Sequence, residues 1–187
     1  MKSRFDLLTT PVVDLLVLQR MPLGDSRGFL ERLFCASELD AQLGGRRIVQ
    51  INRTFTARRG TVRGLHFQRP PHEETKFVSC LRGEVFDVAV DLRPGSATFL
   101  HWHSEILSSE NHKTLLIPEG FAHGFQTLSD DCEMLYFHTA AHNAQAEDGL
   151  NASDPRLAIR WPLFLDGLSP RDSAFSMLDD NFSGVVL

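Results

Sequence analysis

The chain has 187 residues and a formal net charge of -5 at pH 7. This length is enough to bury a sizeable core without cross-links, so we expect a single domain over residues 1–187. The acidic balance lacks the overall positive charge of a nucleic-acid binder, although it leaves room for a local anion site.

The cysteine content and the distribution of apolar residues indicate the cellular compartment of the protein. Cys35, Cys80 and Cys132 are too few and too widely spaced for a disulfide framework, which fits a reducing compartment. Asp6 and Pro11 interrupt the N-terminal apolar residues before a signal peptide can form, and no apolar run approaches the length that spans a bilayer. We therefore expect a cytoplasmic protein with no membrane partner.

Most apolar runs are short and end at Gly, Pro, Asn or Asp, a pattern typical of strands joined by turns. Between the second and third of these runs, CASELDAQLG predicts a short helix that Ser37 caps, Glu38 favours in its first turn and Gly44 ends. A further short helix is expected after Pro162. The candidate strands are residues 12–20, 27–34, 62–68, 76–81, 83–93, 99–107, 113–118, 122–129, 132–140 and 156–162. Ten strands predict an all-β sandwich or barrel.

Four ionisable residues lie on these candidate strands or beside them: His66, Lys76, Asp87 and Tyr136. In a double-sheet jelly roll, polar side chains that alternate with apolar ones can face a ligand cavity between the sheets. Lys76 is one of three lysines, and Tyr136 is the only tyrosine beside 14 phenylalanines, which suggests that its hydroxyl is needed. Structural alternatives stay open, namely a hydrogen-bonded core histidine and a lysine that protects a strand edge.

Two other polar groups lie in the same region of the sequence. Asp87 and Asp91 fall on one face of their strand and need partners, for which Arg63 is a candidate. In IPEGFAHGF, a turn precedes His123, which either bonds to backbone or contacts a ligand. The sequence leaves both interpretations of His123 open.

The HWH sequence raises the question of a metal site. His101 and His103 are two residues apart, so on a strand they would share a face and could hold a metal together. No matching Glu and His follow on neighbouring strands. We therefore expect surface histidines and no metal or other cofactor, with a metal-dependent cupin as an alternative.

Nine segments occur in the order found in one enzyme family. They are RGLHFQ (63–68), Lys76, GEVFDVAVDLR (83–93), SSEN (108–111), IPEGFAHGF (117–125), LY (135–136), DP (154–155), AIRWP (158–162) and LSPRD (168–172). Together they resemble the dTDP-4-dehydrorhamnose 3,5-epimerases, sugar-nucleotide epimerases with a cupin-like jelly roll. The resemblance covers nearly the whole chain and implies a double-stranded β-helix here.

The resemblance also implies an activity and catalytic roles. The reaction would invert C3, C5 or both in a nucleotide-linked 4-keto-6-deoxyhexose without a metal, and the family resemblance implies dTDP as the nucleotide. By similarity His66 would be the base, Asp172 would orient its ring, and Lys76 would lie near the C4 oxygen. Tyr136 would be the acid on the opposite face of the sugar. A positioned acid or base is typically worth about 10² to 10⁴ in rate.

Substrate-binding residues follow from the same resemblance. Arg27 and Arg63 match positions that contact the nucleotide or its phosphates, and two arginines in one pocket suffice for a diphosphate. A homodimer is implied, with N-terminal strands exchanged or packed across the interface. The remaining residues expected to line the site are Gln50, Asn52, Asn111, His123 and His142.

Some positions depart from the family pattern. In RGFLERLF the acidic residue has moved to Glu31, and Arg32 occupies its usual place. His142 lies where a second aromatic is usual, Ala144 replaces a proline and Ala152 replaces a tryptophan. A mono-epimerase or a related keto-sugar-nucleotide isomerase or dehydratase is therefore an alternative, and a non-catalytic sugar-nucleotide binder is an alternative of another class.

Overall fold

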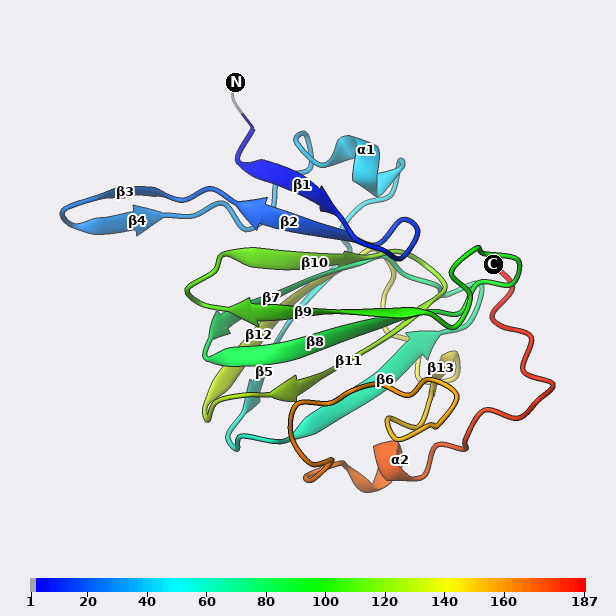
Figure 1. Cartoon of the computed structure of the whole chain (residues 1–187). Coiled ribbons are helices and arrows are strands. Elements are labelled where there is room, and N and C mark those ends of the chain that lie inside the picture. Colours follow the sequence, from blue (N-terminus) through cyan, green and yellow to red (C-terminus); the bar gives the residue numbers. More distant parts are fainter. Residues whose placement is uncertain (1–2) are drawn as a thin grey trace.

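The protein, described here by a computed structural model of residues 3–187, is built around two facing antiparallel β-sheets (Figure 1). The six-stranded sheet contains, in spatial order, β1 (Phe5–Thr9), β2 (Leu16–Arg20), β10 (Lys113–Ile117), β7 (Lys76–Arg82), β12 (Cys132–His138) and β5 (Gln50–Thr56). The five-stranded sheet contains β13 (Glu147–Gly149), β6 (Val62–Gln68), β11 (Phe121–Thr127), β8 (Glu84–Asp91) and β9 (Trp102–Ser108). The predicted all-β jelly roll is confirmed.

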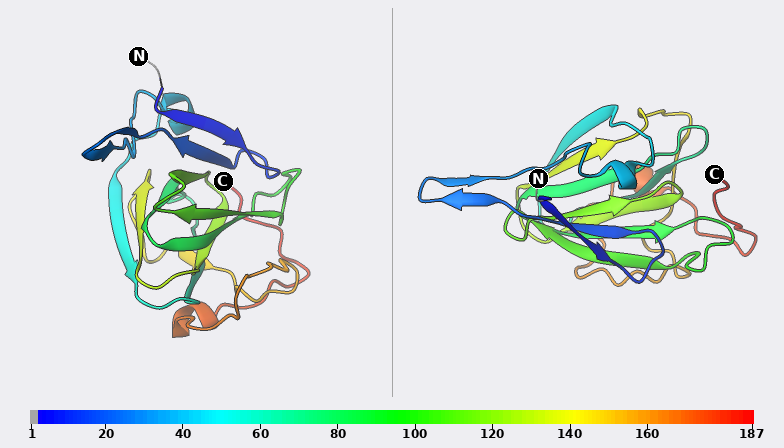
Figure 2. Two further views of the ribbon diagram at one scale, coloured as in Figure 1. Left: turned by 60° about the vertical axis from the view of Figure 1, so that its left-hand side comes forward. Right: turned by 90° about the horizontal axis from the view of Figure 1, so that it is seen from above.

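Three smaller elements complete the structure. Strands β3 (Leu23–Asp25) and β4 (Gly28–Leu30) form a hairpin that projects away from the two sheets (Figures 1 and 2). The helices are single turns, α1 (Asp40–Leu43) beside the six-stranded sheet and α2 (Pro170–Ser173) near β6. Ser169 caps α2 by accepting a hydrogen bond from the Asp172 backbone N–H at 3.0 Å.

The main core lies between the sheets and follows from the period-2 alternation of the strands. On β8, Val85 and Ala89 point into this core, whereas Val88 and Val90 pack on the outer face of the same sheet. The outer face of the five-stranded sheet is covered by the C-terminal segment, and the outer face of the six-stranded sheet by α1 and its flanking residues. Both sheets are therefore covered on both faces over much of their area, which explains why β8 is buried along most of its length.

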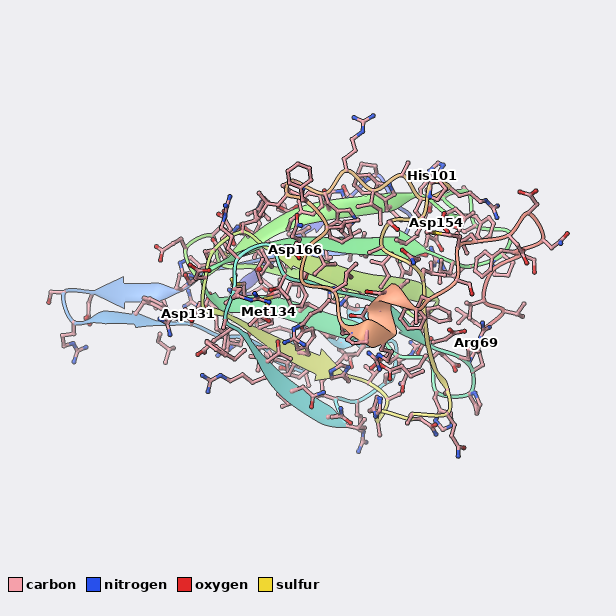
Figure 3. The ribbon with its side chains drawn as sticks, turned by 90° about the horizontal axis from the view of Figure 1, so that it is seen from below. Arg69, His101, Asp131, Met134, Asp154 and Asp166 are labelled. Carbon is pink, nitrogen blue, oxygen red and sulfur yellow. The ribbon has the colours of Figure 1, made fainter. Side chains whose placement is uncertain are left out.

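The expectation of a strand at 156–162 is wrong. These residues form an irregular segment that packs on the five-stranded sheet through buried apolar side chains. The Trp161 indole donates to the Ala152 carbonyl at 2.8 Å, and the Trp102 indole donates to the Leu157 carbonyl at 2.8 Å. Asp154 of the DP sequence, labelled in Figure 3, lies two residues before this segment and is buried. The apolar alternation therefore reflects packing on a sheet instead of pairing within one.

The helix predicted over residues 35–44 is shorter than expected. It starts at Asp40 after Leu39, without a side-chain cap, so Ser37 does not cap it. Gly44 ends it in the left-handed conformation with φ 57°, as the sequence predicts. Strands β1, β3, β5 and β13 were not expected. Of these, β1 and β5 are edge strands with mostly exposed side chains, so they lack the alternation that signals a strand.

Two glycines allow β6 and β11 to approach closely. A Cβ at Gly64, whose φ is 117°, would lie 2.6 Å from the Gly124 Cα, and a Cβ at Gly124 would lie 2.7 Å from the Arg63 carbonyl oxygen. Any side chain at either position would force the two backbones apart. The pairing places His66 directly opposite His123 across the two strands.

Candidate active site

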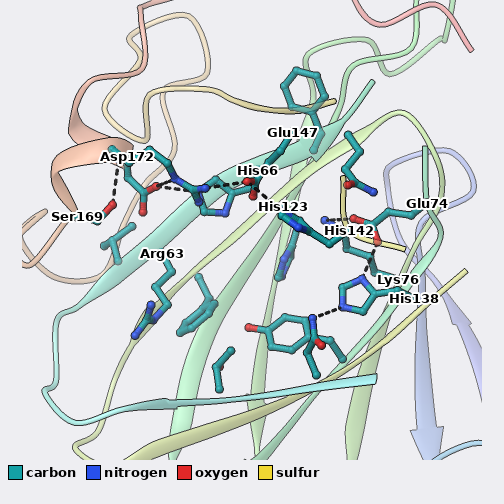
Figure 4. Close-up of a pocket in the computed structure, with 18 of the residues that line it drawn as sticks. Arg63, His66, Glu74, Lys76, His123, His138, His142, Glu147, Ser169 and Asp172 are labelled. Carbon is teal, nitrogen blue, oxygen red and sulfur yellow. Dashed lines mark hydrogen bonds and ion pairs between the residues drawn. The ribbon is translucent and has the colours of Figure 1, made fainter. Parts of the chain in front are cut away.

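A cavity of 630 Å³ opens between the two sheets, a size suited to a small ligand. Its walls come from β5, β7 and β12 on one side and from β6 and β11 on the other, and the segment around α2 covers one end (Figure 4). Nine residues predicted as site residues line it: Gln50, Asn52, Arg63, His66, Lys76, His123, Tyr136, His142 and Asp172.

His66 and Asp172 form a dyad in this cavity. Nε2 of His66 lies 2.7 Å from Oδ1 of Asp172, which is almost completely buried on α2. The Gly64 backbone N–H also donates to the Asp172 carboxylate, at 3.4 Å. Although burial opposes ionisation, the hydrogen bond from His66 helps to lower the pKa of Asp172 below its ordinary value. Asp172 is therefore a carboxylate, which only accepts hydrogen bonds.

The dyad fixes the tautomer of His66. Because the Asp172 carboxylate must accept, Nε2 of His66 carries the proton and Nδ1 keeps the lone pair. Arg171 lies 3.0 Å from the same Nε2, so it acts on His66 through its charge. Burial lowers the pKa of His66 below its ordinary value, and Asp172 offsets this only in part. His66 is thus a neutral imidazole with its basic atom at Nδ1.

Lys76 opens β7 and is buried beside two residues that the sequence did not single out. Its Nζ lies 3.0 Å from Oε1 of Glu74, and the other oxygen of Glu74 lies 2.6 Å from Nδ1 of His138. Lys76 and His138 are direct cross-strand partners on β7 and β12. Although burial opposes ionisation, the His138 hydrogen bond and the Lys76 charge lower the pKa of Glu74. Lys76 therefore has a fixed, ionised partner inside the cavity.

Tyr136 is buried on β12 between two imidazoles. Its ring stacks on His138 with an interplanar angle of 18° and meets the edge of His123 at 71°. Burial and the charge of Asp87 raise the pKa of Tyr136 above its ordinary value. The phenol keeps its proton over the physiological pH range and is suited to act as an acid.

His123 is held by a fully buried carboxylate. Its Nε2 lies 2.9 and 3.0 Å from the two oxygens of Asp87 on the neighbouring strand β8. Burial raises the pKa of Asp87, while the contact with His123 opposes that change. Asp87 therefore pairs with His123, whereas Asp91 pairs with Arg93 at 2.9 Å, so the expected Arg63 partnership is wrong.

Other predicted residues lie around the cavity. Arg63 on β6 donates to the Thr56 hydroxyl at 3.0 Å. Gln50 accepts from the backbone N–H of His142 at 3.0 Å, and the His142 ring lies 3.2 Å from a Glu147 oxygen. These contacts secure the strand β5 wall and the segment before β13.

The structure does not bring Arg27 or Asn111 into the cavity. Arg27 lies at the tip of the β3–β4 hairpin, where its highly exposed side chain pairs with Asp25. Asn111 closes the turn between β9 and β10, where its side chain accepts from two backbone N–H groups and donates to the Ile106 carbonyl at 2.7 Å. Asn111 thus has a structural role in the turn.

Four ionisable residues of the cavity lining were missed by sequence reasoning: Glu74, His138, Glu147 and Arg171. His138 follows Tyr136 by two residues on one strand, so the shared face was a usable signal. Arg171 donates to Glu147 at 2.8 Å, a contact between segments far apart in the chain. No pattern in the sequence predicts that contact.

The HWH histidines take no part in this cavity. His101 is exposed at the rim of the molecule (Figure 3), and His103 lies 3.5 Å from Glu105. Within residues 3–187 no group of three or more His, Cys, Asp or Glu side chains is arranged to hold a metal ion. The described helices also include none long and apolar enough to cross a membrane.

Glu31, the acidic residue whose position differs from the family pattern, pairs with two residues near the hairpin. Glu31 lies 3.0 Å from Arg20, whose side chain is almost completely buried, and 2.8 Å from Nδ1 of His112. Arg32 instead forms an ion pair with Glu38. Glu31 and Arg32, which both depart from the family pattern, therefore make their contacts outside the cavity.

Comparison with known proteins identifies the family. Residues 9–180 match the family model described as dTDP-4-dehydrorhamnose 3,5-epimerase. The chain belongs to the dTDP-4-dehydrorhamnose 3,5-epimerase family. The enzyme of that name from Escherichia coli strain K12 is 40% identical over 178 residues, which cover 94% of this chain and 95% of that protein.

Solved structures agree with this placement in the epimerase family. The Legionella pneumophila dTDP-6-deoxy-D-glucose-3,5-epimerase, in complex with dTDP-4-keto-L-rhamnose, has a TM-score of 0.90 and 39% identity, covering 97% of this chain and 98% of that chain. ChmJ, a 3'-monoepimerase from Streptomyces bikiniensis in complex with dTDP-quinovose, has a TM-score of 0.84 and 26% identity, covering 91% and 86%. The epimerase class and the cupin-like jelly roll expected from the sequence are confirmed.

Proposed function

We propose that this epimerase acts on a dTDP-linked 4-keto-6-deoxyhexose, with His66 as the base and Tyr136 as the acid. The observation that carries the proposal is the convergence of the His66–Asp172 dyad, Lys76 and Tyr136 on one cavity. The complex of the Legionella relative with dTDP-4-keto-L-rhamnose supports the substrate class.

Proton abstraction begins at the carbon next to the C4 ketone. The neutral His66 accepts that proton at Nδ1, and the Asp172 carboxylate stabilises the imidazolium that forms. Electrons from the broken C–H bond move toward the C4 oxygen, which becomes an enolate. The ammonium of Lys76 is suited to stabilise that negative charge.

Return of a proton to the opposite face completes the inversion. Tyr136 belongs to the six-stranded sheet and His66 to the five-stranded sheet, so the two lie on opposite walls of the cavity. The enolate carbon takes the phenolic proton, the phenolate is reprotonated from solvent, and the His66 imidazolium releases its proton to solvent, which restores the free enzyme. The raised pKa of Tyr136 keeps this proton available at neutral pH.

The diphosphate requires cations near the opening of the cavity. Arg63 and Arg171 both line it and provide bidentate donors suited to phosphate oxygens. Gln50, Asn52, His123 and His142 supply the polar groups that surround the sugar and base. No bound metal or cofactor is required by this chemistry.

We further propose that the protein is a homodimer in which Arg27 contacts the nucleotide bound to the partner. The hairpin projects from the sheets and exposes Phe29 and Leu30, with 64% and 69% of their surfaces accessible. Ile51 and Phe55 on the edge strand β5 are also exposed. Apolar surface of this kind supports an interface between subunits.

A mono-epimerase is the second candidate. His142, in place of an aromatic, contacts Glu147 and Gln50 at the edge of the cavity. The likeness to the 3'-monoepimerase ChmJ also favours this alternative. Changes at this edge would alter how the sugar lies against His66 and so which carbon loses its proton.

Incubation with dTDP-4-keto-6-deoxyglucose in D₂O tests the proposal. NMR should show deuterium at both C3 and C5 for a 3,5-epimerase and at one carbon for a mono-epimerase. Absence of exchange at either carbon would contradict the proposed substrate. Exchange that disappears after metal removal by a chelator would favour a metal-dependent cupin.

A further inference from the structure

Glu74 links two side chains that face the cavity. One carboxylate oxygen lies 3.0 Å from Nζ of Lys76, and the other lies 2.6 Å from Nδ1 of His138 (Figure 4). The side chains of Glu74, Lys76 and His138 are only 8%, 11% and 12% exposed. A buried carboxylate with both oxygens occupied holds its partners in one arrangement.

The Glu74 contact determines which nitrogen of His138 carries a proton. Glu74 is ionised, because its pKa lies below the ordinary value, so its oxygens only accept. Nδ1 of His138 is therefore the donor to Glu74, and a ring protonated only at Nδ1 keeps Nε2 as an acceptor. The amide of Asn52 lies 3.4 Å from Nε2, a long contact that leaves this acceptor available to a ligand.

His138 also supports Tyr136. The two rings stack with centroids 6.0 Å apart, and His138 and Tyr136 share one face of β12. A chain of contacts thus runs from Lys76 through Glu74 and His138 to Tyr136. It connects the cation proposed to stabilise the C4 oxygen with the proposed proton donor.

We infer that Glu74 is a positioning residue for the epimerisation and that His138, which it orients, contacts the sugar, an inference that rests on the proposed function. Glu74 holds the Lys76 ammonium as a donor to the ketone oxygen and fixes the tautomer of His138. His138 then presents Nε2 as an acceptor to a sugar hydroxyl next to the ketone. The paired donor and acceptor match a ketone with a neighbouring hydroxyl.

Kinetics of Glu74→Gln, His138→Phe and the double variant test this inference. Glu74→Gln keeps the size of the side chain but removes its charge, and His138→Phe keeps a ring on Tyr136. Each single change should lower kcat by about tenfold to a hundredfold, because small misplacements of reacting groups are costly. The double variant should lose less than the product of the two single losses, since both changes break the same contact.

Two controls separate positioning from a merely structural role. Glu73→Gln makes the same chemical change one residue away, outside the cavity lining, and should leave kcat unchanged. Affinity for dTDP should be unchanged in the Glu74 and His138 variants, because that ligand lacks the sugar. Wild-type kcat in both single variants, or lower melting temperatures with unchanged kinetics, would overturn the inference.

A spectroscopic measurement tests it independently of folding in the variants. Histidine ¹⁵N NMR of the wild-type protein, with His138 assigned from the His138→Phe spectrum, should show the Nδ1–H tautomer. The Nε2–H tautomer would overturn the inference. Wild-type protein that exchanges no deuterium would contradict the proposed function instead, while the tautomer still decides the Glu74–His138 contact.

Discussion

Replacement of Asp172 by Asn isolates the charge behind the proposed base. In the free enzyme His66 is neutral, so its attraction to Asp172 at 2.7 Å becomes a full ion pair only as the proton is transferred. Charges about 4 Å apart interact by about 4 kcal/mol at an effective dielectric constant of about 20. The change therefore removes stabilisation specific to the transition state.

The expected loss in kcat follows from this energy. Since about 1.4 kcal/mol corresponds to a factor of ten, the full interaction is worth about 10³, and the retained hydrogen bond of Asn reduces the loss to about 10² to 10³. An Asn amide that donates to Nε2 would also place the imidazole proton on Nδ1, the wrong atom for a base. KM should change by less than about threefold, because Asp172 makes its main contact with His66.

The assay is the rate of deuterium incorporation into the sugar, measured by NMR at saturating substrate. Melting temperature and dTDP affinity, measured alongside, report whether the fold and nucleotide site remain intact. A kcat within about threefold of wild type in Asp172→Asn would refute the role of Asp172 in stabilising the imidazolium.

Three further predictions concern the proposed acid Tyr136, the pH dependence of kcat/KM, and the turn between β9 and β10 that Asn111 closes. Tyr136→Phe should retain deuterium exchange but form the inverted sugar about 10²-fold more slowly, because the proton donor is lost; product NMR showing inversion at the wild-type rate would exclude Tyr136 as the acid. The pH profile of kcat/KM should fall on acidification through a pKa below 6.5, because burial lowers the pKa of His66 and only its neutral form accepts a proton; a limb above that value would point to another base. Asn111→Ala should leave kcat and KM within about twofold while lowering the melting temperature by roughly 2–8 °C, from about 1–2 kcal/mol of lost hydrogen bonds; a large rise in KM would show that Asn111 contacts substrate.

Local sequence patterns predict much of the fold. Strand β8 alternates between two buried faces and is bounded by Gly83 and Pro94, so it was predicted to within a few residues. Strand β5 was missed because most of its side chains are exposed, which removes the alternation. The segment 156–162 was wrongly predicted as a strand, because its apolar residues pack on the five-stranded sheet without pairing with any of its strands.

The site was predictable only in part, because its contacts join distant segments. His66, Lys76 and Tyr136 stood out as polar groups on apolar strands. Asp172 lies 106 residues from His66 in the chain, and only the family resemblance linked them. The register of β7 against β12, which brings Glu74 to His138, is a tertiary property that no local pattern encodes.

Deuterium exchange by His66→Ala, compared with wild type and with His101→Ala, tests the proposed role of His66 most directly. His101 is exposed outside the cavity, so its variant should exchange deuterium into the sugar at the wild-type rate. His66→Ala should show no enzyme-dependent exchange at C3 or C5 while it still binds dTDP. Exchange by His66→Ala at a rate close to that of wild type would contradict His66 as the base.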